Sequence, residues 1–173
     1  MTKSIKDFIS ALSLPNNITS FTEIGRGIER ESLRVLAQGK LASTPHNPKL
    51  GAALTHPQIT TDYAETLLEF ITPVSYSPEL SIEQLEDVHK YVLENIGEEL
   101  LWPMSMPCFV DDANKIQLAY YGESNIGKMK GVYRQGLKNR YGSMMQVISG
   151  IHFNFSFPNS FWQVIKAQEE NET

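Results

Sequence analysis

The sequence predicts an α+β protein in which helices flank an antiparallel sheet. Three segments have the alternation or the β-rich composition of strands: residues 23–35, 67–72 and 147–157. Between the second and the third lies a segment with apolar residues at helical spacing. At 173 residues the chain is long enough for one domain with a sizeable core.

The first third of the chain is expected to hold a short helix, a long strand and a loop. Residues 4–14 place Ile, Phe and Leu near helical spacing, and the segment beginning at Pro15 ends that helix. The strand of residues 23–35 is followed by Gln38-Gly39, which suggests a hairpin turn into residues 40–43. Residues 44–61 are rich in Thr, Pro, His and Gly, which is typical of an ordered loop.

The middle of the chain contains the clearest helix. Residues 64–74 could form a strand or a helix, and their β-rich end, residues 67–72, favours a strand. A helix then begins with Ser77 as N-cap and Pro78 in the first turn, and its apolar stripe runs to Gly97, a typical helix end.

The last third is expected to hold one helix and one strand. The helix covers residues 129–145 and the strand residues 147–157, where odd positions are mostly apolar and even positions mostly polar. A loop is expected after residues 160–163, and the polar residues 166–173 are expected to be frayed.

Composition excludes several classes of protein. Fifteen Lys and Arg against 20 Asp and Glu give a net charge of −5, which argues against nucleic acid as the main partner. No apolar run approaches the roughly 20 residues that cross a bilayer, and the N-terminus lacks the features of a signal peptide. The single cysteine, Cys108, forms no internal disulfide and reads as a core residue. We therefore expect a cytoplasmic protein with no membrane partner.

Two acids lie on one face of the first strand, in the stretch GIERESLRV. Glu29 and Glu31 are two residues apart, so their side chains point the same way at roughly 7 Å. They could be solvated acids on a sheet surface. If they line a cavity, their repulsion costs about 2 kcal/mol and calls for a cation between them, for which Mg²⁺ is the natural candidate.

Two further strands present ligand-type residues. Glu69 is an acid between apolar neighbours, and a buried acid needs a partner. His152 shares a face with Asn154 and Ser156. Taken singly, a strand histidine is more often a satisfied core residue. Taken together, the three strands favour a carboxylate–metal site.

The segment GKMKGVYRQGLKNRYG is basic within an acidic chain. It holds Lys128, Lys130, Arg134, Lys138 and Arg140 and no acid. This is either a solvated helix face or an anion site for a phosphate or carboxylate.

Asp62 could hold a substrate ammonium or a metal-bound water, or it could cap a turn. The sequence has no Walker loop, G-x-G-x-x-G, H-E-x-x-H or G-x-S-x-G motif.

Five blocks carry a resemblance to a known family. They are GIERESLRV, LGAALTHPQITTDYAETLLEFITPV, LWPMSMPC, VYRQGLKNRYG and SGIHFNFSFP, and they occur in this order between Gly25 and Trp162. In these blocks the chain resembles glutamate–cysteine ligase (γ-glutamylcysteine synthetase) of the proteobacterial type.

The resemblance implies a glutamine-synthetase-like carboxylate–amine ligase fold and the first step of glutathione biosynthesis. In that family ATP phosphorylates the γ-carboxylate of glutamate, and the amine of cysteine displaces phosphate. By motif position Glu29, Glu31 and Glu69 would be metal ligands for Mg²⁺, or for Mn²⁺, with His152 as a metal or phosphate neighbour.

The remaining site residues follow from the same resemblance. Asp62 would lie near the amino-acid substrates, Tyr133 and Gln146 would line the cysteine side, and Arg134 would face an anionic group. Glutamate, cysteine and ATP are the implied small-molecule partners.

Family members are several times longer than this chain. Residues 1–173 are therefore expected to be the N-terminal portion of a larger catalytic domain, inactive alone, with an exposed sheet edge and apolar surface. The alternative is a non-catalytic binding or assembly module that complements a partner chain carrying the missing C-terminal portion.

Overall fold

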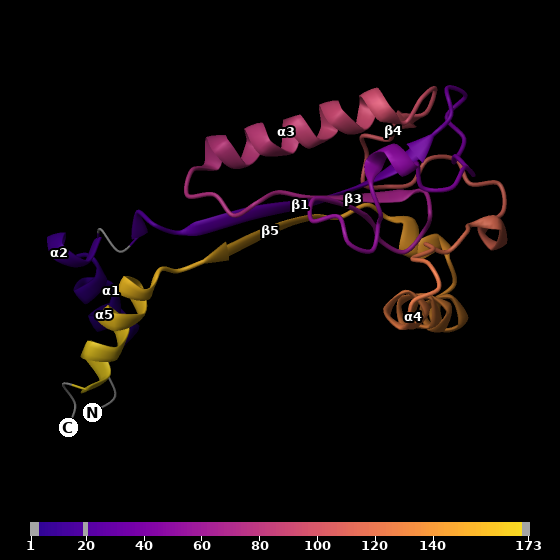
Figure 1. Ribbon diagram of the computed structural model, residues 1–173. Helices are drawn as coiled ribbons and strands as arrows, with labels where there is room; N and C mark the ends of the chain where they lie inside the picture. The colour runs from indigo at the N-terminus through magenta and orange to yellow at the C-terminus, as the bar shows by residue number, and fades with distance from the viewer. Residues whose placement is uncertain (1–3, 19–20, 171–173) are drawn as a thin grey trace.

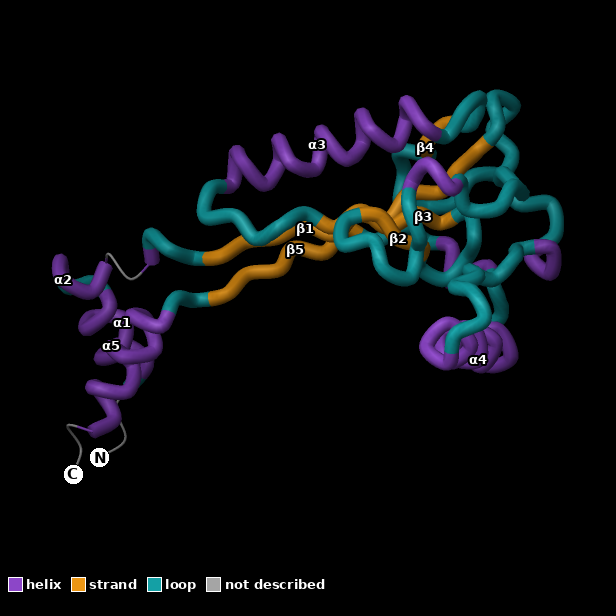
Figure 2. Tube along the Cα trace, viewed as in Figure 1, coloured by secondary structure: helices purple, strands orange, loops and turns teal. Residues whose placement is uncertain are grey.

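The computed structural model describes residues 4–18 and 21–170. Its centre is an antiparallel sheet of five strands, β1 (Gly25–Val35), β2 (Ile59–Thr61), β3 (Leu67–Ile71), β4 (Leu100–Leu101) and β5 (Ile151–Ser156). The central strand is β1, which pairs with β3 along one edge and with β4 and β5 along the other (Figure 1). Strand β2, which Figure 2 labels, pairs with the outer side of β3. The predicted α+β class with an antiparallel sheet is confirmed.

Helices surround this sheet unevenly. The α-helices are α1 (Ile5–Leu12), α2 (Pro15–Ile18), α3 (Pro78–Asn95), α4 (Asn125–Tyr141) and α5 (Asn159–Glu170). Short 3-10 helices cover Pro48–Leu50, Ala113–Lys115 and Met144–Val147. Figure 2 shows β1 and β5 running out from the body as a two-stranded ribbon, at whose end α1, α2 and α5 gather beside both termini.

The two faces of the sheet have different surroundings. One face, called here the covered face, packs Leu68 and Phe70 against Val88 and Val92 of α3. The other, called the open face, carries Glu29, Glu31 and Glu69 in the middle of the sheet and α4 lies on its side of the molecule (Figure 1). Because side chains alternate along a strand, each acid on the open face has an inward-packing neighbour on the covered face.

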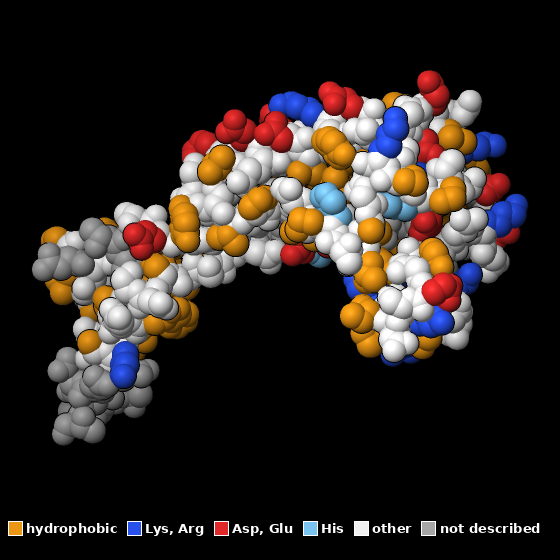
Figure 3. Space-filling view, in the orientation of Figure 1, with side chains coloured by type: hydrophobic (Ala, Val, Ile, Leu, Met, Phe, Trp, Pro, Cys, Tyr) orange, Lys and Arg blue, Asp and Glu red, His pale blue; other side chains and the backbone are white. Residues whose placement is uncertain are grey.

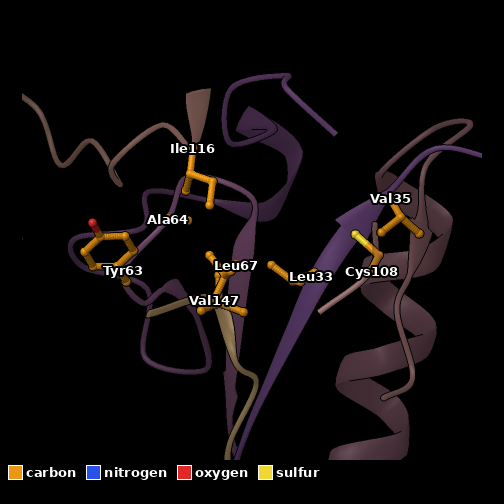
Figure 4. Packing of buried hydrophobic residues seen from close by; sticks show 8 residues of the cluster. All are labelled: Leu33, Val35, Tyr63, Ala64, Leu67, Cys108, Ile116 and Val147. Atoms are coloured by element: carbon orange, nitrogen blue, oxygen red, sulfur yellow. The ribbon is translucent and has the colours of Figure 1, made fainter. Parts of the chain in front are cut away.

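Beyond the acids, the open face continues into a hydrophobic core. Leu33, Leu67 and Val147 lie close together there, with Tyr63 and Ile116 around them (Figure 4). Cys108 is buried in the same cluster, as predicted. This core fixes one end of β1 and β3 and therefore the position of the acids that precede it.

A buried ion pair fixes the far end of β1. The Arg34 guanidinium lies 2.6 Å from a carboxylate oxygen of Glu99, and the two side chains are 2% and 9% exposed. Arg34 also donates to the backbone carbonyls of Thr44 and Glu65. The pair joins the strand to the loop that follows α3.

The predicted helix over residues 77–97 is confirmed, including its caps. The Ser77 hydroxyl accepts a hydrogen bond from the backbone N–H of Leu80, Pro78 begins the helix, and Gly97 has a positive φ of 70°. Acidic side chains line the outer surface of this helix, as Figure 3 shows. The hairpin turn at Gln38-Gly39 is also confirmed, because Val35 pairs with Leu41 across it.

Three expectations are wrong. The 44–61 segment is not all loop, because residues Ile59–Thr61 form β2 against β3. The second helix begins at Asn125 and ends at Tyr141, rather than covering 129–145, because Ser124 caps its first turn and Gly142 leaves it at φ 76°. Residues 164–170 are helical in α5 rather than a loop or a frayed end, and residues 171–173 of the predicted frayed end lie outside the described residues.

The strand predicted over residues 147–157 is shorter and more exposed than its pattern suggests. It spans Ile151–Ser156, and its apolar side chains Ile151, Phe153 and Phe155 are all exposed. Within the described residues its outer edge pairs with no other strand. The expected exposed edge and apolar surface are therefore present.

Candidate functional site

The acids of the open face lie side by side because of strand register. Glu31 is directly opposite Glu69 across β1 and β3, and Glu29 is directly opposite His152 across β1 and β5. Side chains of such opposed residues point to the same face, with Cβ atoms roughly 5 Å apart. The predicted common face of the three acids and the histidine is confirmed. We call these four residues the acidic face.

Hydrogen bonds from β5 and the residue preceding it hold two of the acids. Glu29 bonds to Nδ1 of His152 at 3.1 Å and accepts from the Asn154 amide at 2.9 Å. The backbone N–H of Gly150 donates to Glu31 at 2.7 Å. A Cβ at Gly150 would lie 3.1 Å from Nε2 of His152, so a larger residue there would crowd the site.

Burial and neighbouring charges raise the pKa of two of these acids. The pKa of Glu69 is raised to about 7, first by burial and then by the charges of Asp62, Glu31 and Glu29. Burial also raises the pKa of Glu31, against the opposing effect of the Gly150 hydrogen bond. The hydrogen bond to Glu29 raises the pKa of His152. The open face therefore concentrates acidic groups whose mutual repulsion contributes to the raised pKa values of Glu31 and Glu69.

Asp62 belongs to this electrostatic group, although it lies on the turn between β2 and β3. Its charge raises the pKa of both Glu31 and Glu69. Its backbone N–H donates to the carbonyl of Leu67 at 3.0 Å, which closes the turn. The structure therefore shows the turn position and, in addition, proximity to the acids.

Arg134 anchors this turn to α4. Its Nε donates to the carbonyl of Asp62 at 2.6 Å, and one terminal nitrogen donates to the Tyr121 hydroxyl at 2.7 Å. The Tyr121 hydroxyl in turn bonds to the carbonyls of Thr61 and Asp62. The guanidinium is buried and lies 4.6 Å from the centre of the Tyr121 ring. These donors are directed at a backbone carbonyl and at the Tyr121 hydroxyl rather than at an open anion site.

Two predicted site residues come from α4 and from the 3-10 helix that precedes β5. Tyr133 is exposed on α4, and Gln146 is half-buried in the 3-10 helix that precedes β5. Within the described chain neither side chain hydrogen-bonds to the acidic face. Their substrate-binding roles stay predictions.

The chemistry of the acidic face fits a hard divalent cation, but the set of ligands is incomplete. Carboxylate oxygens are the ligands that Mg²⁺ prefers, and mutual repulsion of this kind is relieved by a cation. Among the residues that the structure describes, no group of three or more His, Cys, Asp or Glu is arranged to hold a metal ion.

Sequence reasoning missed three contributors to the site. Thr60 lies opposite Glu69 on β2, a strand that the composition of residues 44–61 concealed. The backbone N–H of Gly150 donates to Glu31, 119 positions away, and the Tyr121 hydroxyl donates to the carbonyl of Thr61, 60 positions away. Only the period-two spacing of Gly150 from His152 offered a local signal.

The chain has an antiparallel sheet with helices behind it and carboxylates on its open face, and the solved structures that share this fold are of the carboxylate–amine ligase type. The family model described as glutamate-cysteine ligase matches residues 9–173, and the chain belongs to this family.

Sequence relatives agree with this assignment. The glutamate–cysteine ligase of Sodalis glossinidius is 58% identical over 160 residues, which cover 92% of this chain and 31% of the relative. That of Edwardsiella ictaluri is 57% identical over 160 residues, with the same coverage. The chain thus spans about a third of the length of these curated relatives.

Solved structures share the fold. The glutamate–cysteine ligase of Francisella tularensis, in complex with AMP, has a TM-score of 0.83 and 43% identity, covering 86% of this chain and 30% of its own. A bifunctional glutathione synthetase from Pasteurella multocida has a TM-score of 0.80 and 32% identity, covering 97% of this chain and 21% of its own.

No helix in the described ranges is long and apolar enough to cross a membrane. The predicted cytoplasmic location stays a prediction.

Proposed function

We propose that this chain supplies part of the catalytic site of an ATP-dependent ligase that joins the γ-carboxylate of L-glutamate to the amine of L-cysteine. ATP transfers its terminal phosphoryl group to the γ-carboxylate, giving γ-glutamyl phosphate and ADP. The cysteine amine then attacks the acyl carbon, phosphate leaves, and the amine loses a proton. The observation that carries the proposal is the acidic face, in a chain of the glutamate–cysteine ligase family.

The acids of this face would hold Mg²⁺, or Mn²⁺ in its place. Glu29, Glu31 and Glu69 offer the oxygen ligands, and the ion would neutralise the phosphate oxygens of ATP. The protein's own part is to keep these carboxylates together. His152 and Asn154 hold Glu29, and the Gly150 N–H holds Glu31.

Substrate contacts are proposed for three more residues. Asp62 would lie near the amino-acid substrates, and Tyr133 and Gln146 would line the cysteine side. For Arg134 we propose an indirect part, because its donors fix the Asp62 turn. Support for these roles comes from family membership and from the electrostatic coupling of Asp62 to Glu31 and Glu69.

Metal binding is tested by calorimetric titration with Mn²⁺. We expect weak binding that is lost when Glu29→Gln and Glu31→Gln are combined. The matched control combines Glu83→Gln and Glu94→Gln, which remove the same charge from the exposed surface of α3. Unchanged binding in the first double variant would remove the metal from the proposal.

Ligation is tested by a coupled assay of ADP release with glutamate and cysteine. We expect no turnover from this chain alone, because its relatives are about three times longer. Adding a polypeptide that carries the rest of a relative's sequence is expected to restore turnover. If the mixture also shows no turnover, this would count against a catalytic part for this chain.

The exposed strand β5 favours a second candidate, a non-catalytic module that assembles with another polypeptide. Its outer edge is unpaired within the described part of the chain, and Phe153 and Phe155 are 60% and 59% exposed. Such an edge invites strand addition. A monodisperse monomer by light scattering that ignores the complementing polypeptide would count against this candidate.

A further inference from the structure

A cavity lies between helix α3 and the segment that leads into β2. Its volume is about 330 Å³, which is within the range of small-molecule sites. It is lined by His56, Gln58, Ile59, Gln84, Asp87, Val88 and Tyr91. From the polar groups and the apolar floor of this cavity, we infer that it binds an aliphatic α-amino acid. The inference goes beyond the proposed function, which concerns the other face of the sheet.

The floor of the cavity is apolar and belongs to the covered face. Ile59 and Val88 are buried, and they pack in the same core cluster as Phe70. The ring of Tyr91 is held in place beside them, because its hydroxyl donates to the backbone carbonyl of Lys49 at 2.8 Å. An aliphatic side chain of a ligand can therefore leave water on this floor. The sheet separates the floor from the acidic face.

One wall of the cavity presents a fixed hydrogen-bond donor. Nδ1 of His56 accepts the backbone N–H groups of Gln58 at 3.2 Å and of Ile59 at 2.9 Å. In the neutral ring the hydrogen is therefore on Nε2, which bonds to no described residue. The ring also lies against the bare backbone of Gly51, where a Cβ would come within 2.8 Å of Cδ2. A carboxylate oxygen of a ligand is an acceptor for this N–H.

The wall formed by α3 presents acceptors. The side-chain oxygen of Gln84 is buried and has no hydrogen-bond partner among the described residues. A buried polar atom without a partner is uncommon in proteins. Asp87 lies three residues further along α3, and its ion pair with Lys90 is exposed, so that pair holds the carboxylate only weakly. An ammonium group has three N–H donors for these oxygens.

Together the two walls and the floor select the class of ligand. A simple amine would leave the His56 donor unpaired, and a simple carboxylic acid would be repelled by Asp87. The described lining contains no lysine or arginine, which disfavours a phosphate or a dicarboxylate. An α-amino acid with an aliphatic side chain carries an ammonium, a carboxylate and an apolar group in one small molecule.

Binding is tested by titrating the full chain with L-leucine and two analogues. Isopentylamine lacks the carboxylate of leucine, and isocaproate lacks its ammonium. We expect leucine to shift the methyl NMR signals of Ile59 and Val88, with a dissociation constant on the order of 1 mM. Each analogue loses a charge-assisted hydrogen bond and is expected to bind about tenfold more weakly, or not at all.

Three variants of the lining are each expected to weaken leucine about tenfold. In His56→Asn the side-chain oxygen can still accept the N–H of Gln58, but the donor at Nε2 is lost. Gln84→Leu removes the buried unpaired oxygen and is expected to leave the stability unchanged or higher. Asp87→Asn removes the charge alone. The control Glu86→Gln removes a charge from the adjacent position of α3, outside the cavity, and is expected to change nothing.

The inference fails on any of three results. One is that wild-type chain binds no leucine at about tenfold the expected dissociation constant. Another is that the three lining variants, folded by circular dichroism, bind leucine as the wild type does. The third concerns the combined Glu29→Gln and Glu31→Gln variant, which is expected to bind leucine unchanged. Weaker binding there would put the amino acid on the open face instead of in this cavity.

Discussion

Replacing Glu69 with glutamine tests the charge crowding on the open face. The pKa of Glu69 is raised from 4.5 to about 7, first by burial and then by the charges of Asp62, Glu31 and Glu29. The folded chain therefore keeps a proton on Glu69 that the unfolded chain releases, so stability falls as the pH rises from about 4.5 to about 7. A shift of this size corresponds to roughly 3 kcal/mol at most. Solvent screening of a half-buried side chain lowers this to about 1–2 kcal/mol.

Urea unfolding in EDTA, at pH 5 and at pH 8, measures the effect. Glu69→Gln is expected to stabilise the chain by about 1–2 kcal/mol at pH 8 and by clearly less at pH 5, because glutamine has no charge to bury. Glu83→Gln, on the exposed surface of α3, is expected to change stability by less than about 0.5 kcal/mol at both pH values. A Glu69→Gln variant that is equally or less stable than the wild type at pH 8 would refute this reasoning.

Three more predictions follow from the described contacts. Mn²⁺ affinity is expected to fall by up to about tenfold per pH unit below pH 7, because a proton competes with the metal ion for Glu69. The same affinity in titrations at pH 8, 7 and 6 would contradict this. Arg134→Ala is expected to lower the free energy of unfolding in urea by about 2–3 kcal/mol, because it leaves buried carbonyls unpaired. The control Arg140→Ala, at an exposed position on the same helix, is expected to lower it by less than about 0.5 kcal/mol. Equal losses for the two variants would contradict the anchoring role of Arg134. Glu99→Gln is expected to lower the free energy of unfolding by about 3 kcal/mol, because it leaves the buried Arg34 charge without its partner. In the same assay the combined Arg34→Met and Glu99→Leu variant should recover most of this stability. If it does not, the loss has another cause than the unpaired charge.

Local patterns were sufficient to predict the faces of the strands. The two-residue spacing of Glu29 and Glu31, and of His152 and Asn154, sets the direction of their side chains whatever the partner strand. The caps at Ser77 and Pro78 bounded the longest helix for the same reason, since capping uses atoms only a few residues apart. The sequence could therefore name the acids of the open face before their neighbours were known.

Features that depend on distant partners escaped prediction. Strand β2 has three residues and exists because β3 pairs with it, which its own composition does not reveal. The anchoring of Arg134 needs Tyr121 and the carbonyl of Asp62, which lies 72 positions away. A basic segment predicts an anion site equally well whether its arginine faces a ligand or a backbone carbonyl. Only the fold separates these two outcomes.

Strand β5 links the two unusual surfaces of this chain. Its polar side holds Glu29 through His152 and Asn154, while on its apolar side Phe153 and Phe155 are 60% and 59% exposed. Two phenylalanines at this exposure leave roughly 5 kcal/mol of burial unrealised. Within the described residues β5 pairs with β1 alone. The hydrogen bonds that position Glu29 therefore depend on this one strand pairing. Any polypeptide that covers the apolar side would therefore stabilise the strand and, through it, the acids on the opposite side.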